Sequence, residues 1–489
     1  MHPSALAKRL YILLFLVIVA FYFYGLGSLP LLGPDEPRYA QVAREMFLRG
    51  DLITPTLGGH TWFEKPALLY WLMIASYKIF GVNEWSARLG PALCGLLTIV
   101  AVAYVGRAVE RAPDAELTAE GAGGFSFWSA LVMASSLGLI VFSRAASFDV
   151  VITMTMAWAL GFFVVYGLSE RKHARLLVGF YAFVGLSLLA KGLVGIVIPF
   201  GVVGLYYLLR RQWPERQVWL SLAWGLPLAI AVSAIWYGPV IARHGRPFID
   251  EFFIQHHFAR YVSNKYHHPQ PIYFYPVIIL LLALPWSPLL LTALVRIRTW
   301  VWRGGDALSV VRVFALAWLA LPIVFFSFSG SKLPGYILPS LPAAALLIAD
   351  YLVRSKSRWI PGPTARLVIF GVTLIFLAAV LIFAAPRFAE RDSVRDLLQV
   401  AAARGYAGAP VLARTGDDRS AQFYAYDRVV YKADGEVMTF DEMSLEGARA
   451  LGKKIVVLIP AEHVEAVRGA PNIEIIANNG RTAVLGWTP

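Results

Sequence analysis

The sequence predicts a polytopic α-helical membrane protein with about eleven spans, interfacial helices and a small C-terminal α/β domain on the outer side. Two observations lead to this fold class. The chain of 489 residues is 58% hydrophobic and only 15% charged, whereas a soluble domain of this size needs more polar surface to cover its core. Apolar blocks of about 20 residues, long enough to cross roughly 30 Å of hydrocarbon, recur from Tyr11 to Ala385.

The apolar blocks predict the position of each span. The first block follows Lys8-Arg9 but has no small-residue cleavage site before Asp35, so we expect a retained anchor and not a cleaved signal peptide. The only cysteine, Cys94, lies inside a block, which excludes a disulfide framework or a cysteine-based metal site. The predicted spans lie at roughly 9–29, 86–106, 126–143, 149–169, 175–190, 192–210, 217–238, 271–295, 308–328, 336–353 and 366–385.

The positive charges predict the orientation. A net charge of +13 would also suit a nucleic-acid-binding protein, but basic pairs such as Arg171-Lys172 and Arg210-Arg211 lie in short gaps between apolar blocks. Cytoplasmic loops of membrane proteins are enriched in Lys and Arg in this way. With the N-terminus in the cytoplasm, cytoplasmic loops rich in Lys and Arg alternate with less basic outer loops through every span. We therefore expect membrane lipids as partners and no nucleic acid. The tail after Ala385 then lies outside.

Two predicted outer segments, 30–85 and 241–270, are too long to be simple turns. Asp35-Glu36-Pro37 predicts a helix start, with acidic residues and a proline in the first turn. The apolar piece Pro66–Phe80 would extend only about 22 Å as a helix, too short to span. We therefore expect it to lie on the outer membrane surface as an interfacial helix.

The predicted domain boundary lies at 386/387, with a transmembrane domain over 1–386 and a small outer α/β domain over 387–489. Beyond the boundary, short β-rich runs alternate with helical pieces such as Val394–Ala403 and Glu462–Val467. We find no catalytic motif there, and expect a stabilising cap or, as the alternative, a domain that grips the acceptor. The β-rich runs are Val411–Ala413, Phe423–Tyr431, Ile455–Ile459, Ile473–Ile476 and Thr482–Trp487.

The outer segments and turns concentrate the ionisable residues that a catalytic site would need. Charged groups at a membrane cost free energy, so their clustering indicates function. Arg and Lys can stabilise a departing phosphate, while a carboxylate can orient an acceptor or take its proton. This mixture suits sugar transfer from a lipid phosphate. The strings are Gly33–Tyr39, Trp62–Pro66, Ser143–Asp149, His256–Tyr261 with Lys265 and His267-His268, and Ser331–Tyr336.

Parts of these strings resemble motifs of the bacterial lipid A aminoarabinose transferases, which are GT-C-fold glycosyltransferases related to the protein O-mannosyltransferases. The parts are Pro34–Tyr39, Glu64-Lys65-Pro66, Asp149, His256-His257 and Lys332–Tyr336. The resemblance covers about 30–339. It implies a GT-C fold, an undecaprenyl-phosphate-linked sugar donor, and lipid A as the acceptor at the periplasmic face of a bacterial inner membrane. Transfer of another sugar to a glycan or a protein, as by an O-mannosyltransferase, is the alternative within the class.

The resemblance also implies roles for individual residues. It implies a divalent metal ion, zinc or magnesium, and no organic cofactor. The implied roles are catalysis for Asp35 and Asp149, binding of the carrier phosphate for Arg38, Lys65 and Tyr336, lining of the site for Glu36, Tyr39, Arg260 and Lys332, and metal binding for Glu64 and His256.

Several of these residues have a structural alternative. Asp35 and Glu36 could simply cap the helix that begins there. Arg38 and Lys65 could anchor the chain to lipid headgroups. Asp149 begins a span and could be its cap, and a two-residue metal site is a weak pattern.

A transporter or lipid flippase is the competing class of protein. Transporters place charged residues and broken helices near the bilayer midplane and repeat one half of the fold in the other. This chain shows no such repeat, and its ionisable residues gather in the outer loops, so the enzyme is favoured. The short break at Ala190-Lys191 could be a kink in one helix, and Lys191 could face either the site or lipid.

Overall fold

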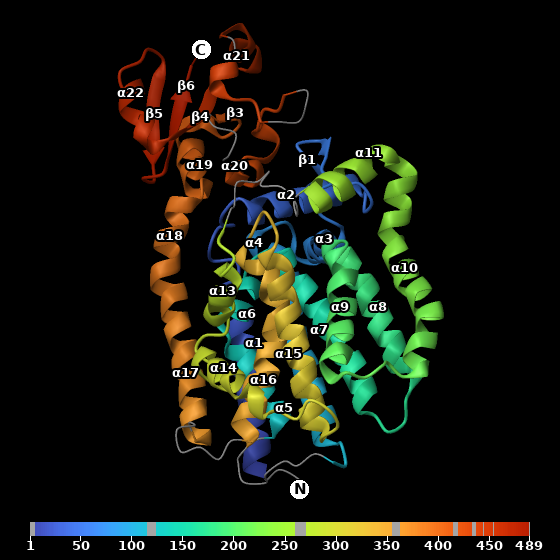
Figure 1. The fold of residues 1–489 in the computed structure, drawn as a ribbon. Helices are drawn as coiled ribbons and strands as arrows, with labels where there is room; N and C mark the ends of the chain where they lie inside the picture. The colour runs from blue at the N-terminus through green and yellow to red at the C-terminus, as the bar shows by residue number, and fades with distance from the viewer. Residues whose placement is uncertain are drawn as a thin grey trace. The chain divides into compact units, whose positions relative to one another are not determined.

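The computed structural model describes residues 5–114, 124–259, 270–354, 362–413, 419–432, 437–443, 445–452 and 454–488 and is mainly helical (Figure 1). The chain divides into two compact units, each built from several segments. The first contains Met1–Tyr24, Phe63–Leu69 and Pro91–Phe376. The second contains Gly25–Trp62, Tyr70–Gly90 and Leu377–Pro489.

The first unit is a set of apolar helices packed side by side. Helix α7 packs on α8, α8 packs on both α9 and α10, and α15 packs on α9 and α16. The helices are α1 (Ala5–Phe23), α4 (Glu84–Glu110, whose first turns belong to the second unit), α5 (Phe125–Ser135), α6 (Leu137–Ser143), α7 (Phe148–Leu168), α8 (Ala174–Lys191), α9 (Val194–Arg210), α10 (Arg216–His244), α11 (Arg246–Ile249), the π-helix η1 (Asp250–Ala259), α13 (Phe274–Leu282), α14 (Ser287–Val295), α15 (Ala307–Ser327), the 3₁₀ helix η3 (Pro334–Ser340), α16 (Leu341–Arg354) and α17 (Pro363–Ala379).

The prediction of a multi-span membrane protein is confirmed. Within the described ranges, seven helices are long and apolar enough to cross a membrane, or eight if α5 and α6, bent by 59°, form one span. Two further predicted spans, 9–29 and 192–210, coincide with shorter apolar helices. The predicted span 271–295 is divided into α13 and α14 on either side of Pro285, which cannot donate a helical hydrogen bond. The count of eleven stays a prediction.

The short break near Lys191 separates two helices. Helix α8 ends at Lys191, and Gly192 has a φ of 76°, which side-chain-bearing residues rarely adopt. Helix α9 then starts at Val194. The break is therefore a turn between helices and not a kink within one.

The second unit combines outer-segment helices with a four-stranded sheet. Helix α2 starts at Asp35, as predicted, and α3 begins within the apolar piece that starts at Pro66. The strand order is β3-β4-β6-β5, with β3 and β4 parallel and the other pairs antiparallel. The elements are α2 (Asp35–Arg49), β1 (Thr56–Leu57), β2 (His60–Thr61), α3 (Leu68–Phe80, from Tyr70 onward), α18 (Ala385–Asp392), α19 (Arg395–Ala401), β3 (Val411–Ala413), α20 (Arg419–Tyr424), α21 (Leu445–Leu451), β4 (Ile455–Pro460), α22 (Val464–Val467), β5 (Ile473–Asn478) and β6 (Thr482–Trp487).

Four of the five β-rich runs predicted in the tail are strands, but the prediction for Phe423–Tyr431 is wrong over most of its length. This run contains the end of α20 and a 3₁₀ turn over Tyr426–Arg428, and only Val429 and Tyr431 form isolated β-bridges, to Val411 and Val437. Helix α20 packs on α2, where the Arg44 guanidinium lies 4.0 Å from the Phe423 ring centroid and donates a 2.9 Å hydrogen bond to the Phe423 carbonyl oxygen. Packing against α2 therefore overrides the strand propensity of the aromatic residues.

A buried ion pair fixes the loop that leads into α2. Arg88 Nε and Nη2 lie 2.9 and 2.7 Å from the two carboxylate oxygens of Glu36. Glu36 Oε2 also accepts a 2.8 Å hydrogen bond from the Leu32 amide. Both charged side chains are thus satisfied although they are buried. The remaining guanidinium N–H groups donate to the backbone carbonyls of Leu26, Leu29 and Pro30.

The substitution Arg88→Met should destabilise the protein strongly. It keeps most of the side-chain volume but leaves the Glu36 carboxylate buried without its cation, which typically costs about 3–5 kcal/mol. Thermal unfolding of the purified chain in detergent would measure the loss. Arg111→Met, at the exposed residue directly after the same helix, is the matched control and should change the melting temperature little. Equal shifts for the two variants would contradict this assignment.

Candidate active site

In the first unit, three turns between helices bring Asp149, Lys191 and Tyr336 together. The carboxylate of Asp149, in the first turn of α7, forms an ion pair with the ammonium of Lys191 at the end of α8. The Asp149 amide donates a 3.1 Å hydrogen bond to Ser147 Oγ, so Ser147 caps the helix and the Asp149 carboxylate is left for other contacts. The side chain that caps α7 is therefore that of Ser147 and not that of Asp149, and the catalytic role of Asp149 stays a prediction.

Tyr336 completes this cluster from the turn between α15 and α16. The Lys191 Nζ atom lies 4.6 Å from the centroid of the Tyr336 ring, within the range of a cation–π interaction. A Cβ atom added to the neighbouring Gly335 would lie 1.9 Å from Asp149 Oδ2. Only glycine at this position lets the turn come so close to the carboxylate.

The sequence left the orientation of Lys191 open, and the structure assigns it to this cluster. Its side chain is 14% exposed and that of Asp149 is 19% exposed, so both charges are largely withdrawn from solvent. A lone lysine at a break between two apolar helices was the available signal. Such a residue has no favourable place in lipid and is stable only beside a counter-charge.

Lys332 lies buried in the same turn as Tyr336 and contacts the second outer segment. Its ammonium donates a 2.9 Å hydrogen bond to the backbone carbonyl of Gln270. Gln270 is the last residue of the predicted outer segment 241–270. The contact therefore joins the string Ser331–Tyr336 to the end of the second predicted outer segment.

Phe63 joins the first and second outer segments within the first unit. Its ring centroid lies 5.0 Å from that of His244 and 5.1 Å from that of Phe248, in edge-to-face geometry. Its amide donates a 3.3 Å hydrogen bond to Glu251 Oε1. Glu64 and Lys65 are thereby held beside α11 and η1.

Glu64 and Lys65 pair with each other. The Lys65 Nζ atom lies 2.9 Å from Glu64 Oε1, and the Glu64 side chain is buried. Burial raises the pKa of Glu251, the hydrogen bond from the Phe63 amide opposes this shift, and the nearby charge of Glu64 adds to it. The carboxylate of Glu64 is therefore close enough to affect the pKa of Glu251, and Lys65 is the counter-charge of Glu64.

The predicted metal ligands do not by themselves supply a metal site. His256 lies in η1, and among the residues that the structure describes no group of three or more His, Cys, Asp or Glu side chains could hold an ion. The Lys65 ammonium on the Glu64 carboxylate also competes with a cation. Metal binding through Glu64 and His256 stays a prediction, and no catalytic step is routed through it. Arg260, predicted to line the site, lies outside the described residues.

In the second unit, Asp35 and Arg38 form an ion pair one turn apart on α2. The Asp35 side chain is 50% exposed, whereas that of Arg38 is 14% exposed. The guanidinium carbon of Arg38 lies 5.3 Å from the Tyr39 ring centroid and 5.4 Å from the Trp62 ring centroid. The aromatic rings fix the cation. Trp62 begins one of the predicted strings but was given no role of its own. Glu36, by contrast, is held by Arg88 and contributes to the loop and not to this pair.

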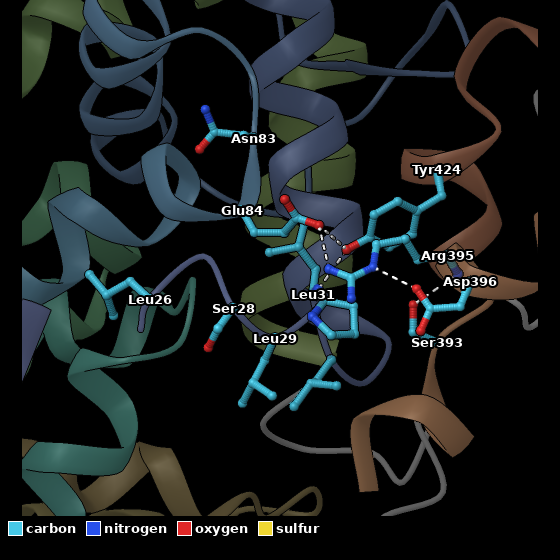
Figure 2. Close-up of polar contacts among 12 residues, drawn as sticks. Leu26, Ser28, Leu29, Leu31, Asn83, Glu84, Ser393, Arg395, Asp396 and Tyr424 are labelled. Atoms are coloured by element: carbon cyan, nitrogen blue, oxygen red, sulfur yellow. Dashed lines mark hydrogen bonds and ion pairs between the residues drawn. The ribbon is translucent and has the colours of Figure 1, made fainter. Parts of the chain in front are cut away.

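A polar network from the C-terminal part of the chain positions the loop before Asp35 (Figure 2). Glu84 Oε1 accepts hydrogen bonds from the Tyr424 hydroxyl at 3.1 Å and from Arg395 Nη1 at 3.2 Å. The Leu31 amide donates to the Tyr424 oxygen at 2.8 Å. Burial raises the pKa of Tyr424 and the Glu84 carboxylate adds to the effect, so the phenol stays protonated and can donate. The Gly33 amide donates to Asp392 Oδ2 at 2.6 Å and fixes the next part of the loop.

Comparison with known proteins matches this chain to membrane glycosyltransferases. Residues 8–242 match the family model for dolichyl-phosphate-mannose-protein mannosyltransferase. The undecaprenyl phosphate-alpha-4-amino-4-deoxy-L-arabinose arabinosyl transferase of Pseudomonas aeruginosa is 30% identical over 350 residues, which cover 71% of this chain. The transferase of the same name from Yersinia enterocolitica is 31% identical and covers 69%. The matches span 60% and 58% of those two proteins, so this chain corresponds to less than two thirds of their length.

Two further similarities extend along the chain. An uncharacterised protein from Aquifex aeolicus is 30% identical over 76% of this chain and 68% of its own length. The crystal structure of ArnT from Cupriavidus metallidurans bound to undecaprenyl phosphate superposes with a TM-score of 0.76, covers 98% of both chains and is 22% identical. That structural likeness shows the fold, and the sequence identities show the family. The chain belongs to the GT-C-fold glycosyltransferase family that includes the aminoarabinose transferases of Pseudomonas and Yersinia.

Proposed function

We propose that the chain transfers aminoarabinose from an undecaprenyl-phosphate carrier to a phosphate of lipid A. The relatives that match it over about 70% of its length carry this donor sugar in their names. The observation that carries the proposal is the meeting of Asp149, Lys191 and Tyr336 from three separate turns. An anion-handling cluster at the ends of apolar helices suits a lipid-linked phosphate substrate.

The proposed orientation follows from the charges of the loops. Eleven spans with a cytoplasmic N-terminus place the turns that carry Asp149, Lys191 and Tyr336 on the same, outer face. They also place the small domain of 387–489 on that face. The site then faces the periplasm from a bacterial inner membrane.

In the proposed reaction the bond between the anomeric carbon of the sugar and the carrier phosphate oxygen breaks. The electron pair stays on the carrier phosphate, and an oxygen of the lipid A phosphate forms the new bond to the anomeric carbon. Because that oxygen is already anionic, no carboxylate has to remove a proton from it. The charge gained by the departing phosphate is what the protein must stabilise.

Most of the predicted residues have a place in this scheme. Arg38, Lys65 and Tyr336 would bind the carrier phosphate, and Lys191, held by Asp149, would add a further cation beside Tyr336. Asp35 and Asp149 would orient the sugar and its amine. The residues that would line the same site are Tyr39, Lys332 and Arg260.

Transfer of a sugar to a protein or another glycan is the second candidate function. The mannosyltransferase family model over residues 8–242 favours it. The two candidates share the carrier phosphate and differ in the acceptor, so the modified product separates them.

Mass spectrometry of lipid A would test the proposed acceptor. Cells that lack the protein, and cells that carry only the Arg38→Ala/Lys65→Ala double variant, should lose the mass increment of aminoarabinose. The reason is that two cations proposed for the carrier phosphate are removed together. Unchanged lipid A in the null cells would overturn the lipid A assignment and turn the search to glycoproteins and other glycans.

The substitution Gly335→Ala should impair transfer. The new methyl group would meet Asp149 Oδ2 at 1.9 Å and a ring carbon of Phe142 at 2.8 Å, and would displace the carboxylate from Lys191. A displacement of about 1 Å at a reacting site can lower the rate by about 10²-fold. Gly204→Ala on α9 is the control, because its added Cβ meets no atom within 4 Å. Similar transfer rates for the two variants would show that the Asp149 position does not matter for the reaction.

A further inference from the structure

We infer that a cationic cavity in the second unit binds the phosphorylated sugar headgroup of the acceptor. The inference rests on the proposed function and names a binding site for one of its substrates. The cavity has a volume of about 560 Å³. This volume lies within the roughly 300–1,000 Å³ of small-molecule sites and is far larger than a single phosphate requires.

The cavity lies where the C-terminal sheet meets the loop before α2. Ala413 ends strand β3, and the segment 458–460 ends strand β4, which runs parallel to β3. Gly33 and Pro34 line the cavity from the loop. In sheets with parallel strands, ligands bind outside the carboxyl ends of those strands, so the cavity lies at the expected place.

The charge of the lining selects an anion. Among the described residues that line the cavity, three are arginines, Arg38, Arg419 and Arg481, and one, Asp392, carries a carboxylate. Asp392 is 8% exposed, and its oxygens accept the Gly33 amide and pair with Arg481. Its charge is thus partly neutralised, while guanidinium groups present the planar pairs of N–H donors that match phosphate oxygens.

The chemistry of the lining favours the acceptor headgroup over the lipid carrier. Ser420 and Thr482 add hydroxyl groups beside the arginines, as a sugar ring requires. All twelve lining residues belong to the loop before α2, the start of α2 or the segment 392–482. Arg38 both lines the cavity and pairs with Asp35, which places a bound headgroup next to the proposed catalytic carboxylate.

Binding of glucosamine 1-phosphate to the purified full-length chain would test the inference directly. The variants Arg419→Gln and Arg481→Gln should each weaken its binding about tenfold, because each removes a charge-assisted contact to phosphate. Arg404→Gln is the matched control, since Arg404 is an exposed arginine of the same domain with an ion pair to Glu474. The control should bind as the unchanged protein does, and unphosphorylated glucosamine should bind none of these proteins measurably.

Two further measurements separate the alternatives. The conservative variants Arg419→Lys and Arg481→Lys, which keep the charge, should restore most of the binding, and melting temperatures would identify any variant that fails to fold. Undecaprenyl phosphate should bind the Gln variants normally. If the Gln variants lose binding of the carrier but still bind glucosamine 1-phosphate, the inference is overturned in favour of a donor site. If the Gln variants bind both molecules as the unchanged protein does, the inference is overturned outright.

The test does not depend on turnover, so its failure differs from failure of the proposed function. Phosphosugar binding that the Gln variants lose, in a chain that leaves lipid A unmodified, would support the cavity and contradict the lipid A assignment. Normal lipid A modification by the Gln variants, with unchanged binding, would contradict the cavity alone.

Discussion

A charged side chain in or beside a membrane is stable only when an opposite charge or enough hydrogen bonds accompany it, and this constraint shapes the whole structure. It pairs Asp149 with Lys191 at the proposed site and Glu36 with Arg88 under the loop before α2. At the other end of the helices of the first unit, Asp350 on α16 accepts hydrogen bonds of 2.6 and 2.9 Å from Arg312 on α15. Each pair joins two different elements, at separations of 38 to 52 residues in the chain, so the same interactions that satisfy the charges also fix the helices.

The pairs differ in what they leave available for chemistry. Glu36 and Arg88 use nearly all of their hydrogen-bonding groups on each other and on the backbone, which suits a structural contribution. Asp149 and Lys191 lie beside the aromatic face of Tyr336 and at a glycine that permits close approach. A cation that is held in place by a carboxylate and is partly withdrawn from water is well suited to stabilise a developing phosphate charge, because no solvent has to reorganise during the reaction.

Local patterns in the sequence were enough to predict much of the fold. The Asp35-Glu36-Pro37 start of α2 and the long apolar helices depend on short-range rules of capping and hydrophobicity, which the residues themselves carry. The strand predicted at Phe423–Tyr431 failed because the helix there is stabilised by packing on α2, nearly four hundred residues earlier in the chain. Propensity cannot report a partner so distant in sequence.

The candidate site could be predicted only in part for the same reason. Residue type and outer position indicated Asp149 and Tyr336, but the partner of Asp149 depends on how three turns meet in space. The orientation of Lys191 was therefore left open, Trp62 was given no role in the site, and Glu36 was expected to line the site although its carboxylate is paired with Arg88. The roles proposed for Arg38, Lys65 and Asp35 still rest on the family pattern together with their pairing.

The most direct measurement is the release of undecaprenyl phosphate by the purified chain from undecaprenyl-phosphate-linked aminoarabinose in the presence of lipid A. The account predicts that one carrier is released for each acceptor modified. It also predicts that Lys191→Met lowers the rate by about 10²-fold or more, because a preorganised donor to the departing phosphate is lost. Carrier release at the unaltered rate in Lys191→Met, or no release by the unaltered chain, would contradict the central claim that the turns around Lys191 form a phosphate-handling site.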